Sequence, residues 1–162
     1  MVNVVLVILA LVLVAAAVVF FVRGGSSDDD TKAQSLSRQY KAVTKAASDE
    51  TRAFLTINYK DVDPMIDKVL AGATGSFKEQ YGAARSQLKS SATTAKAVST
   101  GKVLSAGISE LNSKNAVVFV AANSSVTNTS TKGKAQPRYY RLKLTMVREG
   151  DKWLTSNLEF VG

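Results

Sequence analysis

Residues 2–22 of this chain form one continuous apolar segment, VNVVLVILALVLVAAAVVFFV, in which Asn3 is the only polar side chain and no residue is charged. A helix rises about 1.5 Å per residue, so about 20 apolar residues are enough to cross the hydrocarbon core of a bilayer. Backbone groups in lipid must bond to one another, and a helix satisfies them within one segment. The segment therefore predicts a transmembrane anchor over residues 1–22. The anchor residues that we assign are Val4, Leu6, Ile8, Leu11, Leu13, Val18, Phe20 and Phe21.

A cleaved signal peptide is the alternative interpretation of this segment. Signal peptides begin with a basic region and end at small residues, and Ala15-Ala16-Ala17 is a candidate for that site. No basic residue precedes the segment, however, and cleavage there would leave a very apolar new terminus, so we favour an uncleaved anchor. We also expect that a short basic cytoplasmic segment belongs before the present first residue.

The flanking charges do not settle which membrane face carries the rest of the chain. Arg23, Lys32, Arg38 and Lys41 follow the segment, and basic flanks tend to remain in the cytoplasm. Long domains cross membranes despite such charges. The orientation therefore stays open on charge alone.

Composition narrows the function of the remaining chain. We interpret residues 23–31, RGGSSDDDT, as a flexible linker and residues 32–162 as one domain with its own core. The chain has 21 Lys and Arg against 13 Asp and Glu, a net charge of +8. These basic residues are spread along the sequence, which favours a solubilising surface over binding of anionic lipid or an acidic partner. No pattern typical of nucleic-acid binding is present, so we expect no nucleic-acid partner.

The chain contains no cysteine and no histidine. Thiolate nucleophiles, cysteine metal sites and Ser-His or Cys-His pairs are therefore excluded, and so is the usual general base at neutral pH. We predict no cofactor, no metal and no catalytic residue. The composition favours a binding or structural role.

Apolar spacing predicts helices in the first half of the domain and strands in the second. A three- and four-residue repeat runs from Lys32 to about Tyr59 and includes Val43, Ala47 and Phe54. Asp63 and Pro64 suit the start of a second helix that Gly72 ends, and a third helix follows from Thr74 or Ser76 to Leu88. Strands are then expected at about 98–108, 116–122, 138–148 and 152–161, with turns at 112–115 and 149–151.

Strict alternation assigns side chains to the two faces of the last two strands. Tyr140, Leu142, Leu144 and Met146 share one face of the third strand. In the last strand we place Leu154, Leu158 and Phe160 on one face, and on the other Trp153, Thr155, Asn157, Glu159 and Val161. The fold class is α+β, with three helices packed on a curved antiparallel sheet of about four strands.

This arrangement resembles the Mce-associated membrane proteins of actinobacteria. The resemblance covers nearly the whole chain and rests on residues 69–77 (VLAGATGSF), 101–103 (GKV), 150–154 (GDKWL) and 158–161 (LEFV). It implies a cone-shaped soluble domain similar to nuclear transport factor 2, ketosteroid isomerase and the periplasmic core protein of type IV secretion systems. It also implies an extracytoplasmic domain on a single-pass plasma-membrane anchor, with a supporting role in a lipid- or sterol-importing Mce complex with an ABC-type permease. A type IV secretion-like assembly protein is the alternative.

A catalytic cone is the third hypothesis. An isomerase of this kind needs a carboxylate inside the apolar cone with a proton donor beside it. The carboxylates near the predicted strands are Glu110, Glu149, Asp151 and Glu159, and alternation places Glu159 outside. We therefore expect a non-catalytic protein.

Binding has two candidate surfaces. Aromatic residues concentrate interface energy, so Tyr139, Trp153 and Val161 are the candidate partner surface, unless Trp153 packs under the helices. A lipid or sterol inside the cone would instead contact an apolar lining, and a solid core is the competing expectation. The candidate lining residues are Tyr140, Leu142, Leu144, Met146, Leu154 and Leu158.

Overall fold

A computed structural model of the chain describes residues 27–162. The predicted anchor over 1–22 lies outside these residues, with Val4, Leu6, Ile8, Leu11, Leu13, Val18, Phe20 and Phe21. Within residues 27–162, no helix combines the length and apolar character needed to cross a bilayer. The chain divides after Arg38 into two units, and residues 39–162 form the folded domain considered below.

Four helices come first in the described chain. They are α2 (Ser27–Phe54), α3 (Val62–Gly72), α4 (Gly75–Ala83) and α5 (Arg85–Ala95). Helix α2 begins inside the range predicted as a linker, so residues 27–31 are helical, and it ends five residues before Tyr59. The single third helix that we predicted is two helices, because the chain breaks at Ala84.

Helix ends agree with the sequence in part. Gly72 ends α3 and Thr74 precedes α4, as predicted. The residue that precedes α3 is Asp61 rather than Asp63, and its side chain makes no capping hydrogen bond. Asp63 instead lies in the first turn of α3, where it pairs with cations of α5.

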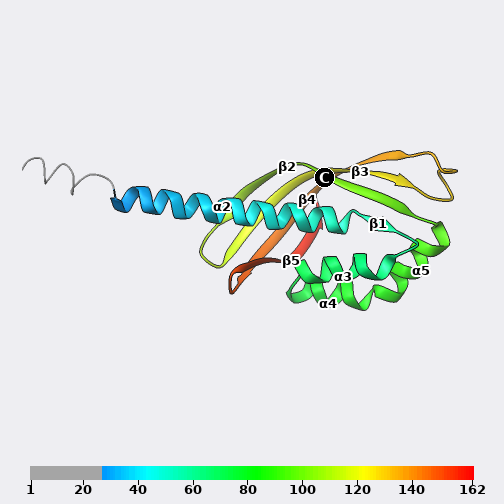
Figure 1. The fold of residues 1–162 in the computed structure, drawn as a ribbon, viewed down its shortest axis with the longest axis horizontal. Coiled ribbons are helices and arrows are strands. Elements are labelled where there is room, and N and C mark those ends of the chain that lie inside the picture. The colour runs from blue at the N-terminus through cyan, green and yellow to red at the C-terminus, as the bar shows by residue number, and fades with distance from the viewer. Residues whose placement is uncertain (1–26) are drawn as a thin grey trace, which may run out of the picture. The chain divides into compact units, whose positions relative to one another are not determined.

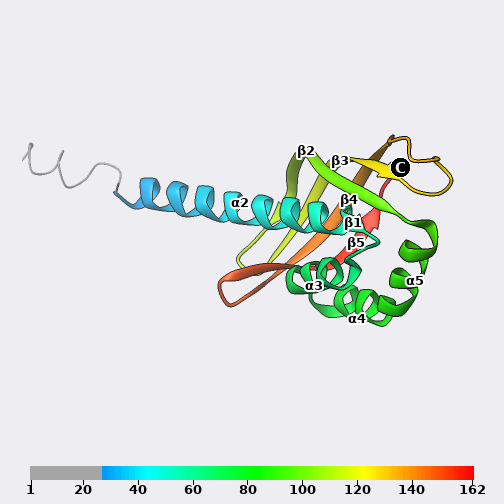
Figure 2. The ribbon, with the colours of Figure 1, turned by 45° about the vertical axis from the view of Figure 1, so that its right-hand side comes forward.

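Five strands form one antiparallel sheet in the order β1-β2-β3-β4-β5. The three long hairpin strands are β2 (Val98–Leu111), β3 (Asn115–Thr127) and β4 (Gln136–Glu149), followed by β5 (Lys152–Phe160). The additional strand, β1 (Ile57–Asn58), pairs only with the start of β2. Residues 39–54 of α2 lie over one face of the sheet, and α3, α4 and α5 form a group beside them (Figures 1 and 2).

Predicted turns connect the strands. The Asn112 side-chain oxygen accepts hydrogen bonds from the backbone N–H groups of Lys114 and Asn115, at 2.9 and 2.8 Å, which closes the β2–β3 turn. Gly150 has φ +60° in the two-residue turn between β4 and β5. A side chain would be strained at that backbone angle, which explains glycine there.

The core lies between α2 and the inner face of the sheet. Val43 and Ala47 of α2 have no exposed surface, and neither have Val118, Leu142 and Leu144 of the strands. All five belong to one apolar cluster. The alternation in β4 therefore places its apolar face inward, as predicted.

The faces of β5 were only half predicted, because this strand contains a bulge. Met146 pairs with Thr155, whereas Thr145 pairs with Asn157, so Ser156 is an extra residue in β5. One extra residue reverses the alternation. Trp153 and Thr155 therefore face the core before the bulge, and Leu158 faces it after the bulge, opposite Leu144. Placing Leu154 with Leu158 and Phe160 on one face was wrong.

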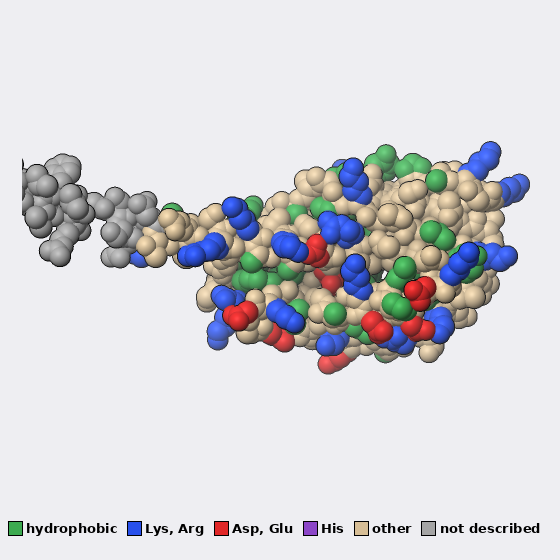
Figure 3. Space-filling model, in the orientation of Figure 1, with side chains coloured by type: hydrophobic (Ala, Val, Ile, Leu, Met, Phe, Trp, Pro, Cys, Tyr) green, Lys and Arg blue, Asp and Glu red, His purple; other side chains and the backbone are tan. Residues whose placement is uncertain are grey.

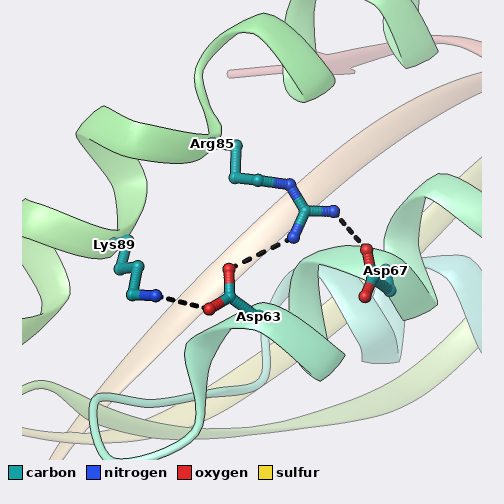
Figure 4. A network of polar contacts seen from close by, with 4 residues as sticks. All are labelled: Asp63, Asp67, Arg85 and Lys89. Atoms are coloured by element: carbon teal, nitrogen blue, oxygen red, sulfur yellow. Dashed lines mark hydrogen bonds and ion pairs between the residues drawn. The ribbon is translucent and has the colours of Figure 1, made fainter.

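A network of ion pairs joins α3 to α5 (Figure 4). Lys89 Nζ lies 2.5 Å from Asp63 Oδ2, Arg85 Nη1 lies 3.2 Å from Asp63 Oδ1, and Arg85 Nη2 contacts Asp67. The hydrogen bond from Lys89, helped by Arg85, lowers the pKa of Asp63. Because these side chains are exposed, solvent weakens each pair, and the network mainly fixes how the two short helices meet.

Candidate functional site

The six side chains predicted to line a cavity do not surround one space. Leu142, Leu144 and Met146 have no exposed surface and belong to the main core cluster. Tyr140 and Leu158 pack against that cluster. Tyr140, Leu142 and Leu154 border three different surface hollows. In this region the structure has the solid core that was the competing expectation.

The three predicted partner residues separate in a similar way. Trp153 is 7% exposed and packs in the core, so it is not a surface anchor. Tyr139 is 74% exposed. Val161 is half-buried, and its backbone N–H donates to the Arg141 carbonyl at 2.9 Å. Tyr139 and Val161 therefore remain as surface candidates, and both belong to the β4 side of the sheet.

Side chains on the outer face of the sheet gather around Arg141. In the strand register, Ala121 of β3 lies opposite Arg141, and Asn123 lies opposite Tyr139. Phe119 lies two residues before Ala121 and is 44% exposed; Leu104 of β2, at a bulge, is 53% exposed. Two adjoining hollows, of about 540 and 320 Å³, share three lining residues on this face. We call this surface the outer patch; it consists of Leu104, Phe119, Ala121, Tyr139, Arg141 and Val161.

The outer patch combines apolar surface with a cation. Leu104, Phe119 and Tyr139 are three of the large hydrophobic side chains exposed in the described chain. Arg141 is exposed and forms no ion pair with any described acid, whereas the neighbouring Lys143 pairs with Glu159 at 3.4 Å. Exposed apolar patches of this kind mark binding surfaces more often than isolated exposed residues do. The chemistry of the patch suits a partner with apolar side chains and a carboxylate.

The free edge of the sheet is less suited to binding. Beyond its pairing with β1, β2 has no strand on its other side. Register shifts occur at Leu104 and at Ser109. Bulges of this kind twist an edge and interrupt its row of hydrogen-bonding groups, so they oppose the addition of another strand.

A second candidate site surrounds Glu50 of α2. Glu50 is only 4% exposed, and its Oε1 atom has no hydrogen-bond partner. Its Oε2 atom lies against the last residue of α3, where a Cβ added to Gly72 would come within 1.9 Å of it. Gly72 does not have a positive φ, so the close approach of the carboxyl, rather than backbone strain, explains glycine at this position.

Burial raises the pKa of Glu50 to about 8. The charged form loses its hydration, and the C-terminal end of α3 offers no compensating positive charge. Glu50 is therefore mostly protonated at neutral pH. Tyr81 of α4 also has a raised pKa, first from burial and then from the charge of Glu50 when it ionises.

Next to Glu50 is a groove of about 570 Å³ between α2, α3 and the start of β5. Its walls are small or apolar, and lysines and aspartates stand at its rim. Figure 3 shows this side of the domain, where hydrophobic side chains along α2 lie between charged ones. We call it the Glu50 groove; its lining includes Ala42, Ala46, Ala53, Ala71, Gly72, Trp153 and Leu154, with Lys45, Asp49, Lys68, Asp151 and Lys152 around them.

The four carboxylates considered from the sequence lie elsewhere or at the surface. Glu159 is exposed, as predicted, and Glu110 is exposed on β2. Glu149 accepts a hydrogen bond of 2.5 Å from the Thr74 hydroxyl, and Asp151 borders the Glu50 groove. The sequence interpretation missed Glu50, although a signal existed. The apolar stripe of α2 passes from Ala47 to Phe54, and the helical repeat between them falls on Glu50 and Thr51.

Comparison with solved structures identifies the fold. The periplasmic domain of DotI superimposes with a TM-score of 0.62 and 14% identity, covering 75% of this chain and 94% of that one. CagV of Helicobacter pylori, a VirB8 homolog, gives 0.60 and 9% over 75% and 97%. A ketosteroid isomerase-like protein from Erwinia carotovora gives 0.50 and 18% over 74% and 92%. The predicted nuclear transport factor 2-like fold is confirmed, with five strands in place of about four.

Sequence comparison finds a mycobacterial relative. The uncharacterized protein Rv1363c of Mycobacterium tuberculosis is 29% identical over 130 residues, which are 79% of this chain and 49% of the relative. The chain thus spans about half the length of that protein. No name found in these comparisons mentions Mce complexes, so that part of the resemblance stays a prediction. Because all residues from 1 to 162 match it, the chain belongs to the family described as uncharacterized protein Rv1363c/MT1408-like.

Proposed function

We propose that this protein is a non-catalytic assembly protein, tethered to a membrane by residues 1–22, whose domain binds a protein partner through the outer patch. The observation that carries the proposal is the outer patch itself, where Leu104, Phe119 and Tyr139 are exposed around the unpaired Arg141. The partner surface we expect presents a carboxylate to Arg141 and apolar side chains around it.

The structural neighbours support an assembly role of the type IV secretion kind over the Mce accessory role. DotI, an IcmL-like protein of Legionella pneumophila and CagV share this fold, and the last two are named as type IV secretion proteins. With identities of 14% or less, these neighbours support the function only by analogy. An extracytoplasmic position for the domain, and an Mce-type lipid importer as the alternative complex, are further parts of the proposal.

Catalysis is not part of the proposal, although Glu50 is a buried acid. An isomerase base must be ionised when its substrate binds, whereas the raised pKa keeps Glu50 mostly neutral at pH 7. Glu50 Oε1 also has no hydrogen-bonded proton donor among the described residues. The arrangement is therefore better suited to holding a neutral group than to removing a proton.

The test is site-specific crosslinking in the full-length chain expressed in a mycobacterial cell. A photoreactive residue at position 119 or 139 should capture a defined envelope-complex subunit, while the same residue at the exposed Glu79 of α4 should not. Arg141→Glu should abolish the capture, because it places like charges at the contact. Secretion-type subunits would support the favoured form, and permease and Mce substrate-binding subunits the alternative. Equal capture from position 79, or capture that Arg141→Glu does not change, would contradict the proposal.

Membrane attachment is tested separately. The full-length chain should sediment with membranes and resist extraction by carbonate, and a protease added to intact cells whose outer layers have been removed should digest the domain. Release of the chain by carbonate would contradict the anchor, and protection from the protease would contradict the extracytoplasmic position.

A further inference from the structure

The Glu50 groove contains an acceptor without a donor. Glu50 Oε1 has almost no contact with solvent and no partner in the described protein. Leaving a buried polar atom unpaired costs about 1–3 kcal/mol relative to a paired one. Proteins keep few such atoms, and one that borders a groove is well placed to bond a bound molecule.

The walls of the groove indicate an apolar body for that molecule. Ala46 and Ala53 of α2 face Ala71 of α3 across the groove, and Trp153 and Leu154 of β5 close it. Small side chains leave room for a chain of methylene groups, while the indole ring offers a broad apolar contact. A groove of about 570 Å³ is in the size range of small-molecule sites.

The charges at the rim argue against a cationic head group. Lys45 is paired with Asp49 at 2.5 Å, whereas Lys68 and Lys152 form no ion pair with any described acid, although Asp151 also borders the groove. The rim is therefore net positive and would repel an ammonium. The two unpaired lysines are exposed and stay hydrated, so they have little need of an anion.

We propose that the Glu50 groove binds an uncharged amphiphile, an apolar chain with a hydroxyl group, whose hydroxyl donates a hydrogen bond to Glu50 Oε1. The protonated carboxyl offers both a donor and acceptors, and a hydroxyl offers the same pair in return. The chain then lies along the alanines and Trp153. This site is distinct from the outer patch, which is on the other face of the sheet.

The test uses three probes with one chain length and different head groups: octanol, octylamine and octanoate. Trp153 is the only tryptophan of the protein and borders the groove, so its fluorescence reports binding directly. The full-length chain is titrated in lipid nanodiscs. We expect octanol to change the fluorescence saturably and to bind at least fivefold more tightly than octylamine or octanoate. Equal or tighter binding of either charged probe, or no saturable response to octanol, would overturn the proposal.

Variants at position 50 test the hydrogen bond itself. Glu50→Leu should weaken octanol binding about fivefold, because it removes the acceptor, while Glu50→Gln keeps an acceptor and a donor and should remain within about twofold. Glu110→Gln makes the same change on an exposed strand position and serves as the control. Unchanged octanol binding in Glu50→Leu would refute the assigned contact. If that variant does not fold, the comparison of Glu50→Gln across the three head groups decides the question.

A variant on the far face keeps this test independent of the proposed assembly role. Tyr139→Ser should leave octanol binding unchanged while it weakens partner capture. Loss of octanol binding in Tyr139→Ser would contradict a separate groove site. Loss of neither activity would count against the outer patch alone.

Discussion

Helix α2 makes two contacts that differ in chemistry. Toward the sheet, Val43 and Ala47 join a cluster that consists of apolar side chains. Toward α3, Glu50 places a carboxyl against Gly72. The first contact stabilises the fold by removing apolar surface from water, whereas the second places an acid where it is neither hydrated nor paired. A protein selected only for stability would have an apolar residue at position 50, so the second contact is where a function is expected.

The largest predicted effect concerns the contact with the sheet. Leu144→Ala should lower the free energy of unfolding by about 3 kcal/mol, because Leu144 is fully buried and its removal leaves a cavity. Leu104→Ala makes the same change at a 53% exposed position and should cost less than about 1 kcal/mol. Chemical denaturation of both variants measures the difference. Equal losses would show that the cluster is not the main core.

The next prediction concerns the acid and its pH dependence. Burial raises the pKa of Glu50 from 4.5 to about 8, so the folded state keeps a proton that the unfolded state loses as the pH rises. Stability is complete below pH 4.5 and falls between pH 4.5 and 8 by about 1.4 kcal/mol per pH unit. Between pH 5 and pH 7.5 the wild type should lose about 3 kcal/mol relative to Glu50→Gln, which has no such group.

Comparison with Glu50→Gln isolates this effect from other carboxyl groups. Asp49 and Asp63 have lowered pKa values through their cationic partners, so their stabilisation is lost as the pH falls through acidic values in both proteins. Denaturation curves at several pH values give the difference between the proteins. A constant difference from pH 5 to pH 8 would show that Glu50 is ionised in the folded state.

A glycine substitution tests the tight fit between α2 and α3. Gly72→Ala should destabilise the domain by about 1–2 kcal/mol, because the new methyl group meets Glu50 Oε2 and pushes the carboxyl aside. Gly107→Ala adds a methyl group to a strand position with nothing within 4 Å and is the matched control. Combining Gly72→Ala with Glu50→Ala should recover much of the loss, which a double-mutant cycle measures. Additive losses would contradict the contact.

The hydrophobic pattern predicted the contact with the sheet well. In β4, Leu142, Leu144 and Met146 were assigned to one face from alternation, and all three are buried. The same logic failed in β5 because the extra residue Ser156 reverses the alternation without any mark in the sequence. Trp153 was therefore placed on the surface, although the structure buries it. Strand β1 was missed because two residues cannot show a period.

The contact with α3 could not be predicted in the same way. Apolar periodicity finds positions that face a core, but an acid at such a position is normally taken as a sign that the face has ended. Glu50 occupies the stripe of α2 together with Thr51, and only the approach of Gly72 from a separate helix reveals why an acid fits there. The outer patch was partly predicted, since Tyr139 and Val161 were named for their apolar character at the end of the sheet. Arg141 was not, because a lone arginine has no distinctive pattern.

The smallest predicted effect has the opposite sign and concerns the neighbour of Glu50. Thr51 has no exposed surface, and its hydroxyl has no hydrogen-bond partner. Thr51→Val keeps the shape and removes an unpaired polar group, so it should stabilise the domain by about 0.5–1 kcal/mol. Thr56→Val is the contrast, because the Thr56 hydroxyl donates to the Arg52 carbonyl at 2.7 Å and accepts from the Gly101 N–H at 3.2 Å. That variant should lose about 1 kcal/mol.

Thermal and chemical unfolding of the two threonine variants therefore separate a polar group retained without a bond from one that contributes a bond. Stabilisation at position 51 with loss at position 56 would mean that the α2 stripe contains polar groups at a cost to stability, as the Glu50 site requires. Destabilisation by Thr51→Val would instead mean that its hydroxyl is bonded in solution. The α2–α3 side would then resemble an ordinary satisfied core, and the argument that it is retained for binding would rest on Glu50 alone.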